Sequence, residues 1–270
     1  EYYSDLYRRY ATYCRNYDGH RLFKVASGAS DYDYRWTEVL MDRIGDGMDG
    51  ISLHYYTTKR WDGPRGSATA FSPEEYYLTL GKSLQIEDVI KRHCEIMDRK
   101  DPEKHVALML DEWGTWWDEE PGTVSGHLYQ QNTMRDAMVA ALTLNIFHKY
   151  TDRIKMANIA QVVNVLQSMI LTDTEGTGHM VLTPTYHVFK MYAPFQNATC
   201  IPLDIQTATR DVEGGKMAQM HEGSVPFVSA TAAITPSGTT VIALANTSLT
   251  ETQQVNIDLG TPNAKTVSGE

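Results

Sequence analysis

The stretch LMLDEWGTWW at 108–117 carries the side chains best placed for chemistry. An apolar run delivers Asp111 and Glu112 at its end, and Trp113, Trp116 and Trp117 follow at once. If the run is a strand of an α/β barrel, its carboxyl end is where active sites lie, and the indoles supply an apolar wall that can tune the pKa of an acid. The pattern therefore predicts a catalytic carboxylate here, with the alternative that two acids only mark the exit of a strand into solvent.

Metal and cofactor chemistry has little support in the sequence. GDGMDG at 45–50 has the GxGxxG spelling of a dinucleotide loop, but it precedes a predicted strand instead of following one, so a plain turn explains it better. The nine histidines show no HExxH pair or other metal spacing. We therefore expect no metal and no organic cofactor. The three cysteines are far apart and are interpreted as buried thiols, namely Cys14, Cys94 and Cys200.

The composition predicts a globular protein and argues against two classes of partner. With 24 Lys and Arg against 34 Asp and Glu, the net charge is -10, and no basic run is present to follow a phosphate backbone. No apolar run reaches the roughly 18 residues that a membrane span needs. We therefore expect no nucleic-acid or membrane partner. The sequence opens on Glu1 within a helical pattern and stops at Glu270 within a β pattern, so we expect a longer protein that is cytoplasmic, periplasmic or secreted.

Hydrophobic periodicity predicts the elements that must position these side chains. Helices are expected over 1–17, 36–44, 72–100, 130–150 and 185–195, and strands over 21–30, 49–56, 105–113 and 154–166. The helix at 72 opens on Ser72, Pro73 and Glu75, a capping box with proline at its first turn. This alternation of helices and strands is typical of an α/β fold with parallel strands.

The composition changes after 195 to Thr, Val, Ala, Ser and Gly with alternating apolar positions. The stretch 227–248 indicates a β-hairpin with its turn at 236–238. We therefore predict two domains, an α/β domain over 1–194 and the start of an all-β domain over 195–270.

Three motifs in register resemble the glycoside hydrolases of family 51, chiefly α-L-arabinofuranosidases. These are DGISLHYY, DEWGTWW and KMANIAQVVNVLQS, in that order and spacing, and the resemblance covers about residues 1–200. It implies that the α/β domain is the second half of a (β/α)8 TIM barrel, strands five to eight, followed by part of a β-sandwich. It also implies a retaining exo-α-L-arabinofuranosidase that removes terminal residues from arabinan, arabinoxylan or arabino-oligosaccharides, from a parent that is a homo-oligomer.

The resemblance assigns site roles to five residues. Glu112 is the implied nucleophile, His54 lies near it, Tyr56 contacts it or the sugar, Trp116 lines the pocket and Gln161 binds the arabinosyl ring. Two of these roles have a stated alternative. His54 could be a core residue, and Gln161, which is expected within a strand, could have another side chain as its partner. Because adjacent residues of a strand face opposite ways, only Tyr55 or Tyr56 can point inward, and Tyr56 shares the face of His54.

One feature of the family is missing. The resemblance places the general acid/base on a Glu within an Asn-Glu pair, and this sequence contains no such pair. A retaining glycosidase needs two carboxyl groups about 5 Å apart. We therefore expect the acid/base to lie outside this chain, and the chain alone to be inactive. Two other functions stay open: a barrel glycosidase acting on β-glucans or xylosides, and a non-catalytic carbohydrate-binding protein.

Overall fold

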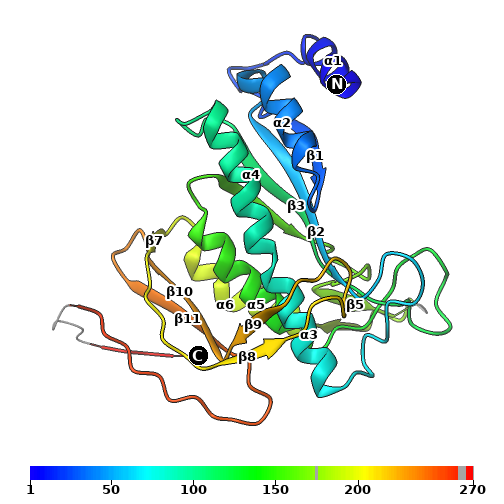
Figure 1. Ribbon diagram of the computed structural model, residues 1–270, viewed down its shortest axis with the longest axis vertical. Coiled ribbons are helices and arrows are strands. Elements are labelled where there is room, and N and C mark those ends of the chain that lie inside the picture. The colour runs from blue at the N-terminus through cyan, green and yellow to red at the C-terminus, as the bar shows by residue number, and fades with distance from the viewer. Residues whose placement is uncertain (174–175, 261–265, 270) are drawn as a thin grey trace.

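The computed structural model describes residues 1–173, 176–260 and 266–269. Its centre is a four-stranded parallel sheet whose spatial order, β1-β2-β3-β4, follows the order of the chain. Helices connect the successive strands, as parallel neighbours require, and run beside the sheet in Figure 1. The strands are β1 (Val25–Ser30), β2 (Gly50–Thr58), β3 (Ala107–Trp116) and β4 (Ile154–Ile159).

The helices begin where capping side chains are available. Ser72 and Glu75 form the predicted capping box, with Pro73 in the first turn, and Thr133 and Asp136 form a second one at the helix that begins at Met134. The predicted turn at 45–50 contains a short 3-10 helix before β2. The helical elements are α1 (Tyr2–Ala11), α2 (Tyr34–Arg43), η1 (Gly45–Gly47), α3 (Pro73–Leu84), α4 (Ile86–Lys100), α5 (Met134–Lys149), α6 (Pro184–Tyr192) and η2 (Ala193–Phe195).

Three local predictions were wrong. The single helix expected over 72–100 is two helices, because ψ of Gln85 is -8°, away from the α-helical value. The Gln85 side chain bonds both the carbonyl and the N–H of His221, at 2.7 and 3.1 Å. The first helix ends at Ala11 instead of residue 17, and Tyr10 and Tyr17, which its pattern counted as apolar, are exposed. Cys14 is exposed too, so only Cys94 among the cysteines is fully buried.

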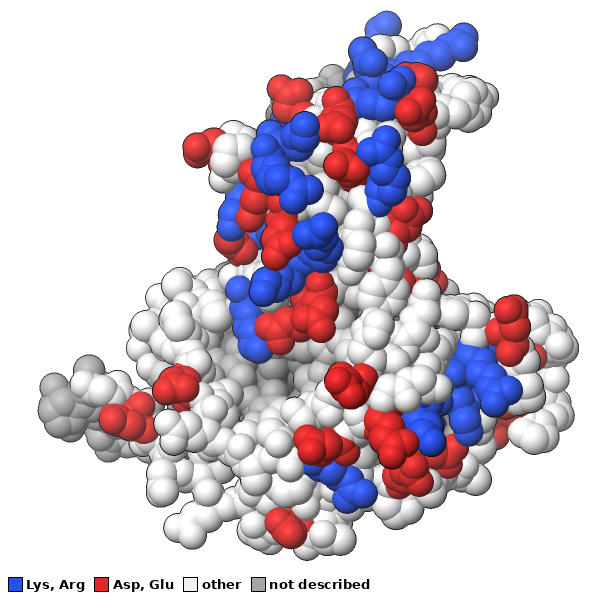
Figure 2. Space-filling view, viewed as in Figure 1, with Lys and Arg blue, Asp and Glu red and all other residues white. Residues whose placement is uncertain are grey.

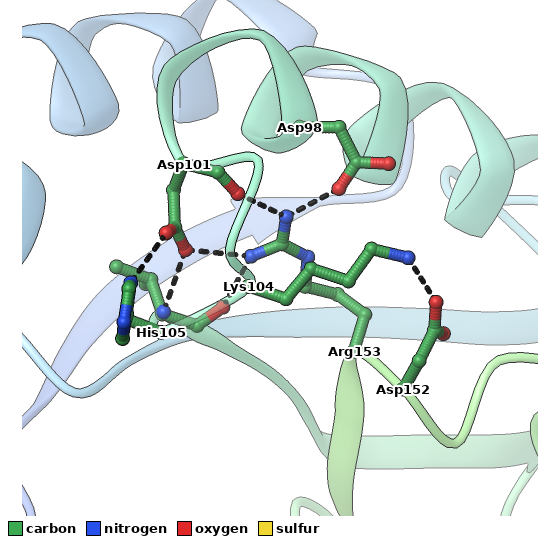
Figure 3. A network of polar contacts seen from close by, with 7 residues as sticks. Asp98, Asp101, Lys104, His105, Asp152 and Arg153 are labelled. Carbon is green, nitrogen blue, oxygen red and sulfur yellow. Dashed lines mark hydrogen bonds and ion pairs between the residues drawn. The ribbon is translucent and has the colours of Figure 1, made fainter.

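Arg153, just before the amino end of β4, bonds groups that precede the amino end of β3, and its side chain is only 1% exposed (Figure 3). One terminal nitrogen of its guanidinium donates to Asp101 Oδ2 and to the Val106 carbonyl, both at 2.8 Å. The other donates to the Asp101 carbonyl at 2.9 Å and pairs with Asp98. Burial by itself would raise the pKa of Asp101, but hydrogen bonds from the Val106 and His105 backbones and from Arg153 lower it to about 2.

Antiparallel strands make up the β region that follows the helices. Its largest sheet has the order β11-β10-β7, and the predicted hairpin is confirmed as β10 and β11. This sheet packs on α5, where Asn145 donates to Ser229 and His148 contacts Thr231. The strands of this region are β7 (Thr199–Ile201), β8 (Thr209–Val212), β9 (Gly223–Pro226), β10 (Val228–Ile234) and β11 (Thr240–Asn246). A separate antiparallel pair, β5 (Ile170–Thr172) and β6 (Met180–Leu182), precedes α6.

The architecture is therefore the expected one, α/β followed by antiparallel strands. The domain boundary at 194/195 stays a prediction. Residues 261–265 and 270 of the predicted all-β domain lie outside the described residues. On the face in Figure 2, Lys and Arg intermingle with Asp and Glu over the helical part of the molecule. Of the helices in the described ranges, none is long and apolar enough to cross a membrane.

Candidate active site

Glu112 is held at both of its carboxylate oxygens by side chains of the neighbouring strand. The Tyr56 hydroxyl donates to Oε1 at 2.7 Å, and His54 Nδ1 lies 2.8 Å from Oε2. His54 and Tyr56 are two residues apart on β2 and so share a face, and His54 is the register partner of Glu112 on β3. The strand continues to Trp116, so Glu112 does not simply mark the exit of a strand into solvent.

A bulge in β3 brings a second carboxylate to the same histidine. The register of β3 shifts by one residue between its pairs with Ser52 and His54. Adjacent residues of a regular strand face opposite ways, but here Asp111 Oδ1 also lies 3.3 Å from His54 Nε2. Burial raises the pKa of Asp111, and the charge of Glu112 adds to this while His54 opposes it. Asp111 Oδ1 is itself buried and makes no hydrogen bond to any described residue.

The two adjacent tyrosines of β2 face opposite ways, and Tyr56 is the one beside Glu112. Tyr55 is buried in the core, and its hydroxyl donates to the Lys82 carbonyl at 2.7 Å. Tyr56 faces Glu112, and burial together with this hydrogen bond raises the pKa of its hydroxyl. The Tyr56 phenol therefore stays protonated and remains a hydrogen-bond donor at neutral pH.

Only one of the three expected tryptophans faces this carboxylate. Trp116 packs edge-on against Tyr56, with 5.1 Å between ring centroids. Trp113 is instead in the core against Phe147 and Phe189. Trp117 is also buried, and its indole N–H donates to Asp136 at 2.9 Å. The expectation that all three form the wall was wrong for two of them.

Gly114 lets β3 pass close to the loop after β4. Its φ is +142°, and a Cβ there would lie 3.2 Å from Gln167 Oε1. The same Gln167 oxygen accepts the Thr115 N–H at 2.9 Å. A side chain at position 114 would therefore strain the backbone between Glu112 and Trp116.

Gln161 lies beyond β4, which ends at Ile159, so its expected position within a strand was wrong. It follows buried Ala160, which packs with Tyr56 and Leu166, and it is exposed at the same end of the sheet as Glu112. Its backbone N–H donates to the Val165 carbonyl at 3.0 Å. Among the described residues, the structure brings together Glu112, His54, Tyr56 and Trp116 by direct contact, but not the Gln161 side chain.

Sequence reasoning missed Trp61, Arg65 and Gln219 in the surroundings of the site. The Arg65 guanidinium lies 4.6 Å from the centre of the Trp116 ring, and Trp61 packs at right angles to the same ring at 6.3 Å. Trp61 follows Tyr56 by five residues, a spacing that could have drawn attention to it. No group of three or more His, Cys, Asp or Glu side chains in the described ranges is placed to hold a metal ion.

Glu112 lies at the carboxyl end of parallel strands, where barrel enzymes carry their active sites, and glycoside hydrolases use carboxylates of this kind. Residues 111–270 match the family model described as the α-L-arabinofuranosidase C-terminal domain. The chain belongs to this family. The match crosses the predicted boundary at 194/195.

Known proteins agree with this assignment. The whole chain is 61% identical to 51% of the Bacteroides ovatus protein named intracellular exo-α-L-arabinofuranosidase. It is 31% identical, over 56% of its length, to 31% of an Acetivibrio thermocellus protein named intracellular exo-α-(1→5)-L-arabinofuranosidase. The crystal structure of the GH51 arabinofuranosidase of Xanthomonas axonopodis pv. citri matches 91% of the chain with a TM-score of 0.84 and 46% identity, covering 48% of that protein.

These matches confirm the resemblance to family 51 and the predicted fold class. The chain spans about half the length of the Bacteroides and Xanthomonas proteins.

Proposed function

We propose that the full-length protein containing this chain is a retaining exo-α-L-arabinofuranosidase with Glu112 as its nucleophile. The observation that carries the proposal is the contact of both Glu112 oxygens with His54 and Tyr56 at the carboxyl end of the sheet. The names of the similar Bacteroides and Acetivibrio proteins support the substrate, a terminal α-L-arabinofuranosyl residue of an oligosaccharide or polysaccharide. The word intracellular in both names supports a location inside the cell.

In the proposed mechanism each residue has a step. Glu112 attacks the anomeric carbon and forms a glycosyl-enzyme, while a second carboxylic acid protonates the departing glycosidic oxygen. That acid/base is a Glu outside this chain, because the family places it in an Asn-Glu pair and none is present here. His54 and Tyr56 fix the attacking carboxylate, Trp116 lines the pocket, and the exposed amide of Gln161 bonds a sugar hydroxyl.

The test is hydrolysis by the full-length protein of a panel of nitrophenyl glycosides, with the anomer of the released sugar followed by NMR. We expect cleavage of the α-L-arabinofuranoside with retention, and little cleavage of the β-glucoside or β-xyloside. Preference for one of the latter two would instead support another barrel glycosidase. Binding of arabino-oligosaccharides without hydrolysis would support a carbohydrate-binding protein.

A further inference from the structure

The loop between β8 and β9, residues 213–222, reaches from the β region back to the carboxyl end of the parallel sheet. It lies beside the segment that follows β2 in Figure 1. The Ala218 N–H donates to the carbonyl of Thr58, the last residue of β2, at 3.2 Å. The Gln85 side chain holds the His221 backbone, as described above. Two buried methionines on either side of Gln219, Met217 and Met220, pack into a core cluster with Tyr76 and Leu80.

Gln219 is one of the exposed residues of this docked loop. Its side-chain Oε1 accepts a hydrogen bond from the Trp61 indole N–H at 3.2 Å. Its φ is +52°, a conformation that residues other than glycine rarely adopt, and its carbonyl accepts the Tyr32 hydroxyl at 3.5 Å. The backbone contacts of the neighbouring residues hold this conformation, so the loop does not depend on the Gln219 side chain for its position.

A row of aromatic rings links Gln219 to the nucleophile. Trp61 packs at right angles to Trp116, and Trp116 packs edge-on against Tyr56, whose hydroxyl binds Glu112. Trp61 is therefore the ring farthest from Glu112, and we call Trp61 and Trp116 together the aromatic wall. Indole rings can stack on the apolar faces of sugars, and a ring whose orientation is fixed before binding loses less entropy when the sugar binds.

We propose that Gln219 is a positioning residue that fixes Trp61 in the aromatic wall and so determines how well the site binds the part of the substrate outside the arabinosyl pocket. The inference rests on the proposed function and extends it to the β region. Because Trp61 lies beyond Trp116 as seen from Glu112, its effect falls on the leaving-group sugars of an arabino-oligosaccharide. A substrate without such sugars, such as an aryl arabinofuranoside, contacts the wall less.

The experiment compares Gln219→Leu and Gln219→Glu in the full-length protein. Leucine removes the acceptor at similar size, whereas glutamate keeps an oxygen for the Trp61 N–H. Gln206→Leu, the same change at an exposed glutamine between β7 and β8, is the matched control. The measurements are kcat and KM for α-1,5-arabinotriose and for nitrophenyl α-L-arabinofuranoside, together with Tm.

We expect Gln219→Leu to raise KM for arabinotriose about tenfold, the effect of losing one positioning hydrogen bond, with kcat and the aryl KM changed less than about twofold. Gln219→Glu should restore the arabinotriose KM, and Gln206→Leu should match the wild type. An unchanged arabinotriose KM in Gln219→Leu, an equal rise for both substrates, or a Gln219→Glu variant as impaired as Gln219→Leu would each overturn the role of Gln219.

If the wild-type protein hydrolyses neither substrate, the proposed enzymatic function is wrong. Gln219 is then tested by calorimetric binding of arabinotriose to the wild type and the same variants. About tenfold weaker binding by Gln219→Leu alone supports the positioning role, and equal binding or no binding by the wild type rejects it.

Discussion

The two ends of the parallel sheet use charged side chains in opposite ways. At the amino end, Arg153 is buried and both of its terminal nitrogens are bonded to carboxylates and carbonyls. At the carboxyl end, Asp111 and Glu112 face one histidine, and Asp111 Oδ1 has no hydrogen bond to a described residue. The side chains of His54, Asp111 and Glu112 are each about a third exposed, so a ligand can reach them, whereas Arg153 is 1% exposed and can only stabilise the fold.

The backbone of β3 is regular at the amino end of the sheet and irregular at the carboxyl end. β3 pairs in regular register with β2 from Ala107 to Met109 and then bulges where it reaches Asp111 and Glu112. Bulges commonly lie beside active sites because they re-aim side chains. Substitutions at the carboxyl end should therefore change activity more than stability, and those at the amino end should do the reverse.

The largest expected effect is on activity at the carboxyl end. In the full-length protein, Glu112→Ala should lower hydrolysis of an aryl arabinofuranoside by about 10⁴-fold or more, because the nucleophile is lost. Added azide should partly restore turnover by attacking in its place. Glu103→Ala, which removes an exposed carboxylate near the opposite end of the same strand, is the control and should leave kcat unchanged. Near-normal activity of Glu112→Ala would reject its assignment as nucleophile.

The next effect is on stability at the amino end. Arg153→Met should lower the free energy of unfolding by about 3–5 kcal/mol, because it removes a buried guanidinium and leaves Asp101, whose side chain is 11% exposed, without this partner. Denaturant titration measures this, and Lys155→Met, at an exposed position of β4 just after Arg153, should change it by less than about 0.5 kcal/mol. The kcat of the folded Arg153→Met protein should match the wild type. A large fall in kcat without loss of stability would contradict the division between the two ends.

A smaller effect on activity is expected from the groups around the nucleophile. His54→Ala and Gln161→Ala should each reduce kcat/KM by about 10²-fold, the loss of one hydrogen bond made in the transition state. His20→Ala, at an exposed position away from the sheet, serves as the control. Because His54 is half-buried and Gln161 is exposed, both variants should fold. Unfolding of both without a separate kinetic effect would instead assign them structural roles.

The sequence was most informative where the relevant physics is local. Alternation along β2 was enough to choose Tyr56 over Tyr55, because residues two apart share a face. The same alternation along β3 separates Trp116 from Trp113 and Trp117, so the wrong expectation for these two was avoidable. In contrast, the end of β4 before Gln161 is set by the loop that packs Ala160 and Leu166 against Tyr56.

Contacts between distant segments left no pattern in the sequence. The Gln85 side chain, at the break between α3 and α4, bonds the backbone of His221, and the partner of Trp61 is Gln219, 158 residues away. Neither contact changes the local periodicity from which helices and strands are predicted. The β region therefore looked separate from the site, although its β8–β9 loop reaches it.

The smallest expected effect concerns the acid dependence of stability at the amino end. The pKa of Asp101 is lowered from 3.8 in the unfolded chain to about 2 in the folded protein, so its contribution to stability is fully present above about pH 4. It is lost as the pH falls from about 4 to about 2, where the folded carboxylate takes up its proton. Unfolding curves of the wild type and of Asp101→Asn between pH 2 and pH 6 should therefore differ at pH 6 and converge toward pH 2. Asp62→Asn, at an exposed position, should parallel the wild type throughout. A gap between wild type and Asp101→Asn that stays constant down to pH 2 would show that Asp101 stabilises the sheet by the shape of its hydrogen bonds and not by its charge.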